Sequence, residues 1–167
     1  MIPTSKPRWL RAALYGLGFA FAMGTLLGLF IGATGALPFP EPVVLVAAGF
    51  VGFAQAIVIH RGAVRITRGV AALSIPCGLL ISFWAHVLGV TLFVGSYGGI
   101  GVGLWDILLA YPAIVQDNLE FTRVIYSYGA LVAAASIVSL LWVFKGDDIR
   151  RAVAFPDGFA ERLGRHG

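Results

Sequence analysis

Long runs of hydrophobic residues separated by short polar or glycine-rich breaks dominate the chain, and they predict helices that cross a membrane. The runs cover residues 10–33, 43–60, 69–94 and 121–144. A helix rises about 1.5 Å per residue, so roughly 20 residues cross the ~30 Å hydrocarbon core of a bilayer. The sequence therefore predicts an all-α, four-transmembrane-helix bundle over residues 1–144. A cytoplasmic polar tail would follow over residues 145–167.

Proline and glycine mark the breaks between these runs. Pro38, Pro40 and Pro42 prevent the first helix from continuing. Pro76 lies inside the third run, where a membrane helix tolerates proline and usually kinks. The glycine-rich stretch 95–103 disfavours helix. The apolar stretch 104–116 after it is too short to cross a bilayer, so it predicts either an interfacial or a re-entrant segment.

Composition supports a membrane location. The chain is 59% hydrophobic and 12% charged, with a mean hydropathy of +0.89, whereas soluble domains carry about 25% charged residues. So few charges cannot cover a water-facing surface of this size. The first apolar run is also longer than the hydrophobic part of a secretory signal, so we expect a retained membrane helix.

The basic residues predict the orientation. Of the 12 Lys and Arg residues, Arg123 alone falls on the opposite side of a four-span arrangement, among acidic residues. The positive-inside rule then places both termini in the cytoplasm. Short loops and the lack of an N-x-S/T site favour a bacterial inner (plasma) membrane. Contacts with anionic lipid head groups or an acidic partner are expected from one set of arginines: Arg61, Arg65, Arg68, Arg150 and Arg151.

Small residues recur at every fourth position of the first run and indicate where helices pack closely. The predicted packing residues are Gly16, Ala20, Gly24, Gly28, Gly32, Gly52 and Gly78. In the fourth run two registers are open, Gly129 with Ala133 or Ala130 with Ala134. The glycine face of the first helix could pack inside the bundle or against a partner subunit.

Polar side chains inside the runs form one predicted layer near the basic ends. Its members are Tyr15, Gln55, Ser74, Cys77 and Ser139. They could hold helices together through hydrogen bonds or line a substrate cavity. No Asp, Glu, Lys or Arg lies in the middle of a run, which argues against an autonomous ion-coupled pump. Cys77 could ligate a soft metal, but a lone thiol in a span usually serves as a small packing residue.

His86 is the single candidate for cofactor binding, and the cofactor it would bind stays unknown. It lies near the end of the third run, so Tyr126, Ser127 and Tyr128 should be at comparable depth. A neutral imidazole there could bind a metal or relay a proton, or simply bond to a neighbouring helix. A haem held by two histidines is excluded within one chain, since His60 and His166 lie at the opposite end.

Residues that could perform chemistry are otherwise scarce. Asp117 and Glu120 have the spacing of a capping box for the fourth helix, with Arg123 one turn on. No zinc-protease, serine-hydrolase or nucleotide-loop motif occurs, so we predict neither a catalytic site nor a metal site.

Three functions fit this sequence. We expect a non-catalytic membrane subunit (a scaffold, anchor or small subunit) that packs against other membrane subunits or a second copy, and does not bind nucleic acid. A small-solute transport or channel component is the alternative. A cofactor- or metal-binding protein centred on His86 is the third.

Overall fold

The computed structural model describes residues 8–35, 41–63, 66–98 and 103–144, which form helices and, within those ranges, no strand. The helices are α1 (Trp9–Thr34), α2 (Glu41–Ala63), α3 (Arg68–Ala72), α4 (Ser74–Gly98), α5 (Leu104–Asp117) and α6 (Leu119–Val138). A π-helical turn, η1 (Ser139–Phe144), extends α6.

Four helical stretches have the length and composition of membrane-spanning helices: Trp9–Thr34, Val46–Ala63, Arg68–Ser96 and Leu119–Phe144. They coincide with the four predicted runs, so the expectation of four long apolar helices is confirmed. Large apolar side chains cover their outer surfaces, with Leu10, Phe50 and Trp142 at least 73% exposed. Such a surface matches lipid rather than water. The chain therefore has the character of an integral membrane protein.

The third predicted helix is divided at Leu73 into α3 and α4. Pro76 explains the break, because it has no amide proton to donate to the carbonyl of Ala72, and its ring clashes with that carbonyl. Thr67 caps α3, its hydroxyl accepting a bond of 3.2 Å from the Val70 amide. Instead of a kink at Pro76, the helix is therefore interrupted at Leu73, three residues before the proline.

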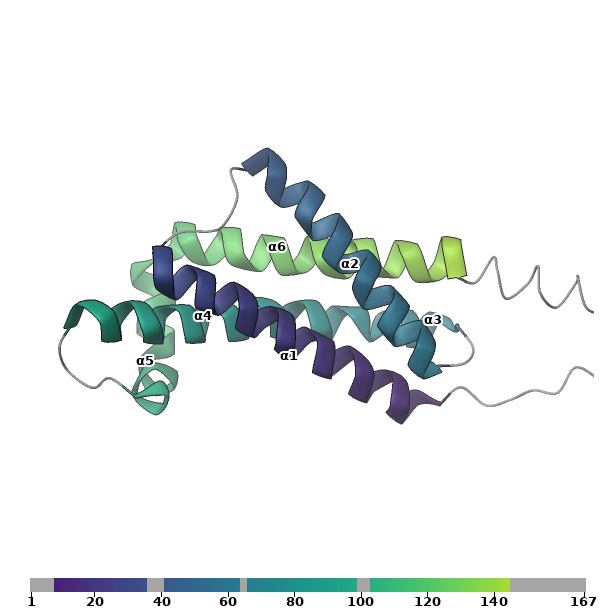
Figure 1. Cartoon of the computed structure of the whole chain (residues 1–167), viewed down its shortest axis with the longest axis horizontal. Helices are drawn as coiled ribbons and strands as arrows, with labels where there is room; N and C mark the ends of the chain where they lie inside the picture. Colours follow the sequence, from purple (N-terminus) through teal and green to yellow (C-terminus); the bar gives the residue numbers. More distant parts are fainter. Residues whose placement is uncertain (1–7, 36–40, 64–65, 99–102, 145–167) are drawn as a thin grey trace, which may run out of the picture.

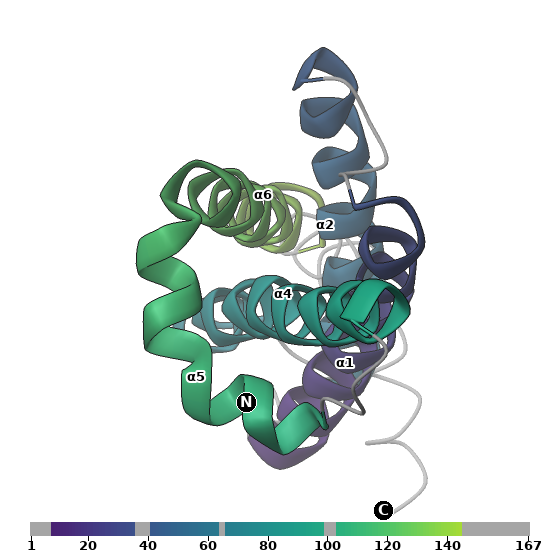
Figure 2. The ribbon, with the colours of Figure 1, turned by 90° about the vertical axis from the view of Figure 1, so that its left-hand side faces the viewer.

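Figures 1 and 2 show α1, α4 and α6 lying side by side along the long axis of the molecule. α2 crosses α1 and diverges from the bundle toward its own N-terminus, in both views. The start of α1, the end of α2, α3 and the end of α6 lie at one end of the bundle (Figure 1). The end of α4, α5 and the start of α6 meet at the other.

The segment between the third and fourth spans is a single helix, α5, which lies crosswise over one end of the bundle (Figure 2). Gly103 donates its amide proton to Asp106 Oδ2 at 2.9 Å and so starts the helix. α5 ends at Asp117, and Asn118 connects it directly to α6. The predicted capping of α6 by Asp117 is wrong, because Asp117 still belongs to α5.

Candidate functional site

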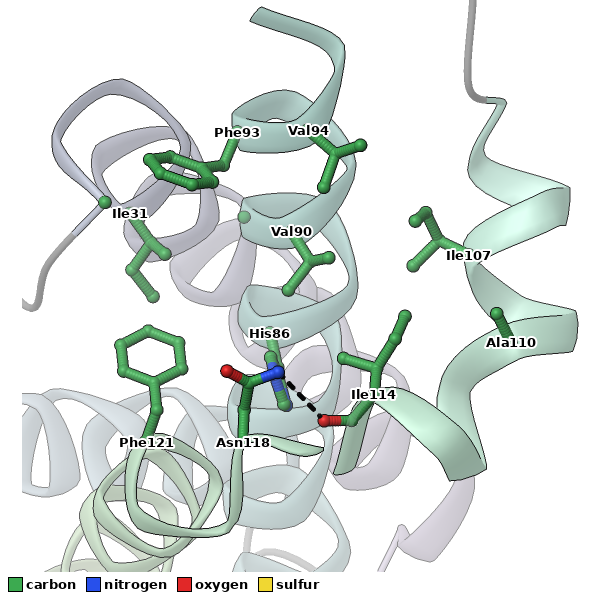
Figure 3. Close-up of a pocket in the computed structure, with 12 residues that line it drawn as sticks. Ile31, His86, Val90, Phe93, Val94, Ile107, Ala110, Ile114, Asn118 and Phe121 are labelled. Atoms are coloured by element: carbon green, nitrogen blue, oxygen red, sulfur yellow. Dashed lines mark hydrogen bonds between the residues drawn. The ribbon is translucent and has the colours of Figure 1, made fainter. Parts of the chain in front are cut away.

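A cavity of about 650 Å³ lies where α1, α4, α5 and α6 meet at the α5 end of the bundle. Its walls are apolar apart from two side chains, His86 of α4 and Asn118 at the α5–α6 junction. Figure 3 shows aliphatic residues of α4 and α5 facing each other across it, with the rings of Phe93 and Phe121 at the opposite side. The remaining lining residues are Ile31, Gly35, Gly89, Val90, Val94, Ile107, Ala110 and Ile114.

Local structure brings each helix to this cavity. α1 ends at Gly35, which adopts a positive φ of 66° and donates its amide proton to the Ile31 carbonyl at 2.7 Å. Glycine is the residue that adopts this helix-ending conformation without strain. The direct junction at Asn118 turns the chain from α5 into α6, and its side-chain amide donates to the Ile114 carbonyl at 3.3 Å.

His86 is completely buried and belongs to a hydrogen-bonded chain of three side chains. Its Nδ1 lies 3.1 Å from the Tyr111 hydroxyl oxygen, which lies 2.8 Å from the Tyr126 hydroxyl oxygen. These hydrogen bonds therefore connect α4, α5 and α6. Tyr126 lies close to His86, as expected from its position in the fourth run, but it is linked to the imidazole through Tyr111.

Sequence reasoning missed the role of Tyr111. In the sequence, Tyr111 is one residue of the apolar stretch 104–116, and no spacing pairs it with His86. The pairing depends on α5 crossing the end of the bundle. Burial, and then the bond to Tyr126, raise the pKa of the Tyr111 phenol, so Tyr111 stays protonated and can always donate.

Aromatic rings surround the imidazole edge-on. The rings of Tyr111 and Phe121 lie 5.4 Å and 5.7 Å from that of His86, at 70° and 74°. Phe83 packs against Tyr111 in the same way, at 5.2 Å. His86 Nε2 is buried and has no hydrogen-bond partner among the described residues. A buried imidazole nitrogen without a partner is costly, and it therefore calls for a functional explanation.

The predicted polar layer forms only in part. Gln55 Nε2 donates to the Ser74 carbonyl at 3.3 Å, and the hydroxyls of Ser74 and Ser136 are 2.8 Å apart. All three residues are completely buried between α2, α4 and α6. Ser136 was missed, and Ser139 was placed there instead, although its hydroxyl bonds to the Ala135 carbonyl of its own helix. One helical turn separates these two serines. Their similar distance from the end of the run does not show which one faces inward.

Two other predicted members lie elsewhere. Tyr15 is 42% exposed and accepts a hydrogen bond of 3.1 Å from the Arg11 guanidinium, so it points away from the layer. Cys77 is buried in an apolar cluster with Ala20, Ile81 and other residues. A thiol in such surroundings acts as a small packing group. Within the described residues, Gln55, Ser74 and Ser136 form bonds between helices.

The predicted packing glycines of α1 lie against α4. A Cβ built at Gly24 would lie 3.0 Å from the Ile81 carbonyl oxygen, and one at Gly32 would lie 2.5 Å from Leu92 Cβ. Gly16 meets Cys77 and Ile59, and Ala20 is also buried. The whole predicted face, Gly16, Ala20, Gly24, Gly28 and Gly32, is therefore occupied within the chain. It is not available to a partner subunit.

The other predicted packing glycines lie against α6. A Cβ at Gly52 of α2 would come within 2.5 Å of the Val132 carbonyl oxygen. Gly78 of α4 meets the Gly129 carbonyl. α6 uses Gly129 and Ala133 in these contacts, and both are buried. Ala130 and Ala134 are exposed, so the structure selects the first of the two registers considered for this helix.

The basic end of the bundle is described for two of its five predicted contact residues. Arg61 and Arg68 are exposed there, whereas Arg65, Arg150 and Arg151 lie outside the described residues. His60 stacks on Phe144 of η1 with ring centroids 4.8 Å apart.

At the opposite end, the carboxylates of Asp106, Asp117 and Glu120 are exposed and do not converge. Across the part of the chain that the structure describes, no three His, Cys, Asp or Glu side chains are grouped closely enough to hold a metal ion. Comparison with known proteins adds no assignment to this arrangement. No protein-family model, curated protein or solved structure matches the chain.

Proposed function

We propose that the chain is a non-catalytic subunit of a larger membrane assembly, with both termini in the cytoplasm. The observation that carries this proposal is the outward face of α6. Ser127, Ala130 and Ala134 are exposed there, and no described helix of the chain covers them. Helices in lipid associate through small residues that let backbones approach, so this face suits a helix of another subunit.

A second surface supports the same proposal. Because α2 diverges from α1, the two helices leave an apolar groove of about 350 Å³ between them. Met23, Leu26 and Phe30 of α1 face Ala47 and Phe50 of α2 across it. Helices that splay in this way gain dispersion contacts when another apolar segment fills the gap.

Transport is less well supported by the same geometry. Gln55, Ser74 and Ser136 of α2, α4 and α6 bond to one another, and the cavity beside His86 lies at the α5 end of the bundle. For the orientation, the exposed arginines at the α1 N-terminal end favour the cytoplasm. α5, with Trp105 and Leu109 70% exposed, is proposed to lie in the interface on the opposite side.

Gentle extraction of the full chain from its native membrane tests the proposal. We expect a detergent particle that contains other polypeptides or several copies of the chain, and expect the double substitution Ala130→Phe, Ala134→Phe to reduce it to one 17.7 kDa chain. The matched control is Leu79→Phe, which places the same ring at a 49% exposed position of α4. A single-chain particle for the wild type, measured by light scattering, would contradict the proposal.

A further inference from the structure

We propose that the cavity between α1, α4, α5 and α6 binds a neutral lipophilic molecule that carries a carbonyl group, held by a hydrogen bond from His86 Nε2. The inference goes beyond the proposed subunit role and does not depend on it. Three observations carry it: the size and apolar walls of the cavity, the unpartnered imidazole nitrogen, and the charge of the surrounding surface.

The cavity suits a small molecule with an apolar body. Its volume, about 650 Å³, falls within the roughly 300–1,000 Å³ of ligand pockets. Ten of the lining residues are apolar or glycine, and two are polar. Such sites use few polar groups to orient a ligand that is held mainly by its hydrophobic part. The wall that α5 provides places the cavity beside the end of the spans, within reach of molecules dissolved in the bilayer.

The hydrogen-bonded chain decides what His86 can offer. The neutral Tyr111 phenol has one proton, which it can give to His86 Nδ1 or to Tyr126. An imidazole nitrogen is a better acceptor than a phenol oxygen, so Tyr111 donates to Nδ1 and Tyr126 donates to Tyr111. The imidazole proton then resides on Nε2. Nε2–H is the buried donor that has no acceptor among the described residues.

Asn118 is the other polar side chain that lines the cavity with His86. In the view of Figure 3 its amide overlaps the imidazole. Asn118 is exposed, and its recorded bond, to the Ile114 carbonyl, is long at 3.3 Å. A ligand carbonyl oxygen that enters the cavity beside this amide can accept a hydrogen bond from Nε2–H, which satisfies the buried donor.

Charge restricts the ligand to a neutral one. The exposed side chains at this end are acidic at Asp106, Asp117 and Glu120, against one cation at Arg123. Such a surface disfavours an anionic head group, and a donor N–H disfavours a cationic one. Quinones and acyl esters both have the features that fit this site, a neutral carbonyl group and a long apolar chain.

Native mass spectrometry of the purified full chain can test the site with three probes of similar size: a decyl-substituted benzoquinone, a decanoyl glycerol ester and decylbenzene. We expect one molecule of a carbonyl probe to bind per chain, about tenfold more tightly than decylbenzene, which lacks the acceptor. Preference for the quinone or for the ester identifies the source of the carbonyl. Equal affinity for all three probes, or no saturable binding, overturns the proposal.

Two pairs of variants separate binding from folding. His86→Asn keeps an acceptor near the Nδ1 position but loses the Nε2 donor, so we expect it to bind the carbonyl probe about tenfold more weakly. His86→Gln keeps a donor near the Nε2 position and should bind the probe nearly as the wild type does. Ala110→Phe fills the cavity and should abolish binding, whereas Ala113→Phe, on the same helix but outside the cavity, should not. Unchanged binding in His86→Asn and Ala110→Phe rejects the site even if one of them folds poorly.

The imidazole itself gives a readout independent of affinity. In protein with ¹⁵N-labelled histidine, the His86 signals should show a neutral ring protonated at Nε2. Addition of the carbonyl probe should shift the Nε2 proton signal, and decylbenzene should not. A ring protonated at Nδ1 contradicts the proposed direction of the hydrogen bonds.

Discussion

At the residue scale, glycines of one helix have opposite environments. A Cβ built at Gly28 would lie 2.9 Å from Leu88 Cβ and 3.1 Å from the Ala85 carbonyl oxygen, whereas one at Gly18 meets nothing within 4 Å. Gly28 therefore lets α1 and α4 approach, and Gly18 faces outward. Both are glycines in the same apolar helix, and they differ only in the face of the helix on which they lie.

This difference gives a matched pair of variants. Gly28→Leu should destabilise the protein by about 1–3 kcal/mol, because the larger side chain forces α1 away from α4. Gly18→Leu should leave the free energy of unfolding unchanged or slightly raise it, since leucine favours helix. Unfolding in mixed detergent micelles measures both. Equal destabilisation by the two variants would show that α1 does not pack as described.

Gln55 shows how little a buried polar residue can contribute. Its Nε2 makes one bond to the Ser74 carbonyl at 3.3 Å, and its Oε1 has no partner among the described residues. Loss of a weak interhelical bond costs about 0.6 kcal/mol in membrane proteins, and removal of an unsatisfied oxygen offsets it.

Gln55→Leu should therefore change the free energy of unfolding by less than about 1 kcal/mol. The same unfolding titration measures it, with Ser136→Ala as the comparison because it removes the shorter bond to Ser74. A loss of several kcal/mol in Gln55→Leu would mean that Oε1 has a partner, such as water, in a wetter layer than the structure indicates.

At the scale of elements, α5, the helix that lies across the bundle, forms much of the candidate site. α5 supplies Tyr111 to the His86 chain and the wall that closes the cavity, yet its sequence is consistent with either an interfacial or a re-entrant segment. Its outward face carries Trp105 and Leu109, while Ile107 is buried against the bundle. We propose that this outward face lies in the membrane interface.

The depth of α5 can be measured through Trp105. With Trp9, Trp84 and Trp142 replaced by Phe, Trp105 fluorescence should be quenched more strongly by lipids brominated near the head group than by lipids brominated near the chain ends. Such a result follows from an interfacial position. A variant that keeps Trp84 alone, in the middle of α4, is the control and should show the reverse order. Deep quenching of Trp105 would indicate a re-entrant segment.

At the scale of the whole molecule, the two ends differ in charge. The exposed arginines Arg61 and Arg68 lie at one end, and the carboxylates Asp106 and Asp117 at the other. Proteins of the inner membrane retain their Lys- and Arg-rich ends in the cytoplasm. The arrangement of the four spans predicts which end a reagent outside the cell can reach.

Cysteine labelling tests this orientation. In a Cys77→Ser background, a cysteine in the substitution Asp106→Cys should react with a membrane-impermeant maleimide added to intact cells, and Arg61→Cys should react only after the membrane is opened. Labelling of both positions from outside would place the two ends on one side and refute the four-span arrangement.

The sequence alone determined the number of long apolar helices, their limits within a few residues, and the asymmetry of charge along the chain. These properties follow from the free energy of transferring each stretch of chain into hydrocarbon, which is local and additive along the chain. The tertiary structure decided which small residues meet which helix, that Ser136 and not Ser139 bonds to Ser74, and that Tyr111 reaches His86. Those outcomes depend on the rotation of each helix and on the path of α5, which arise from contacts between segments distant in sequence.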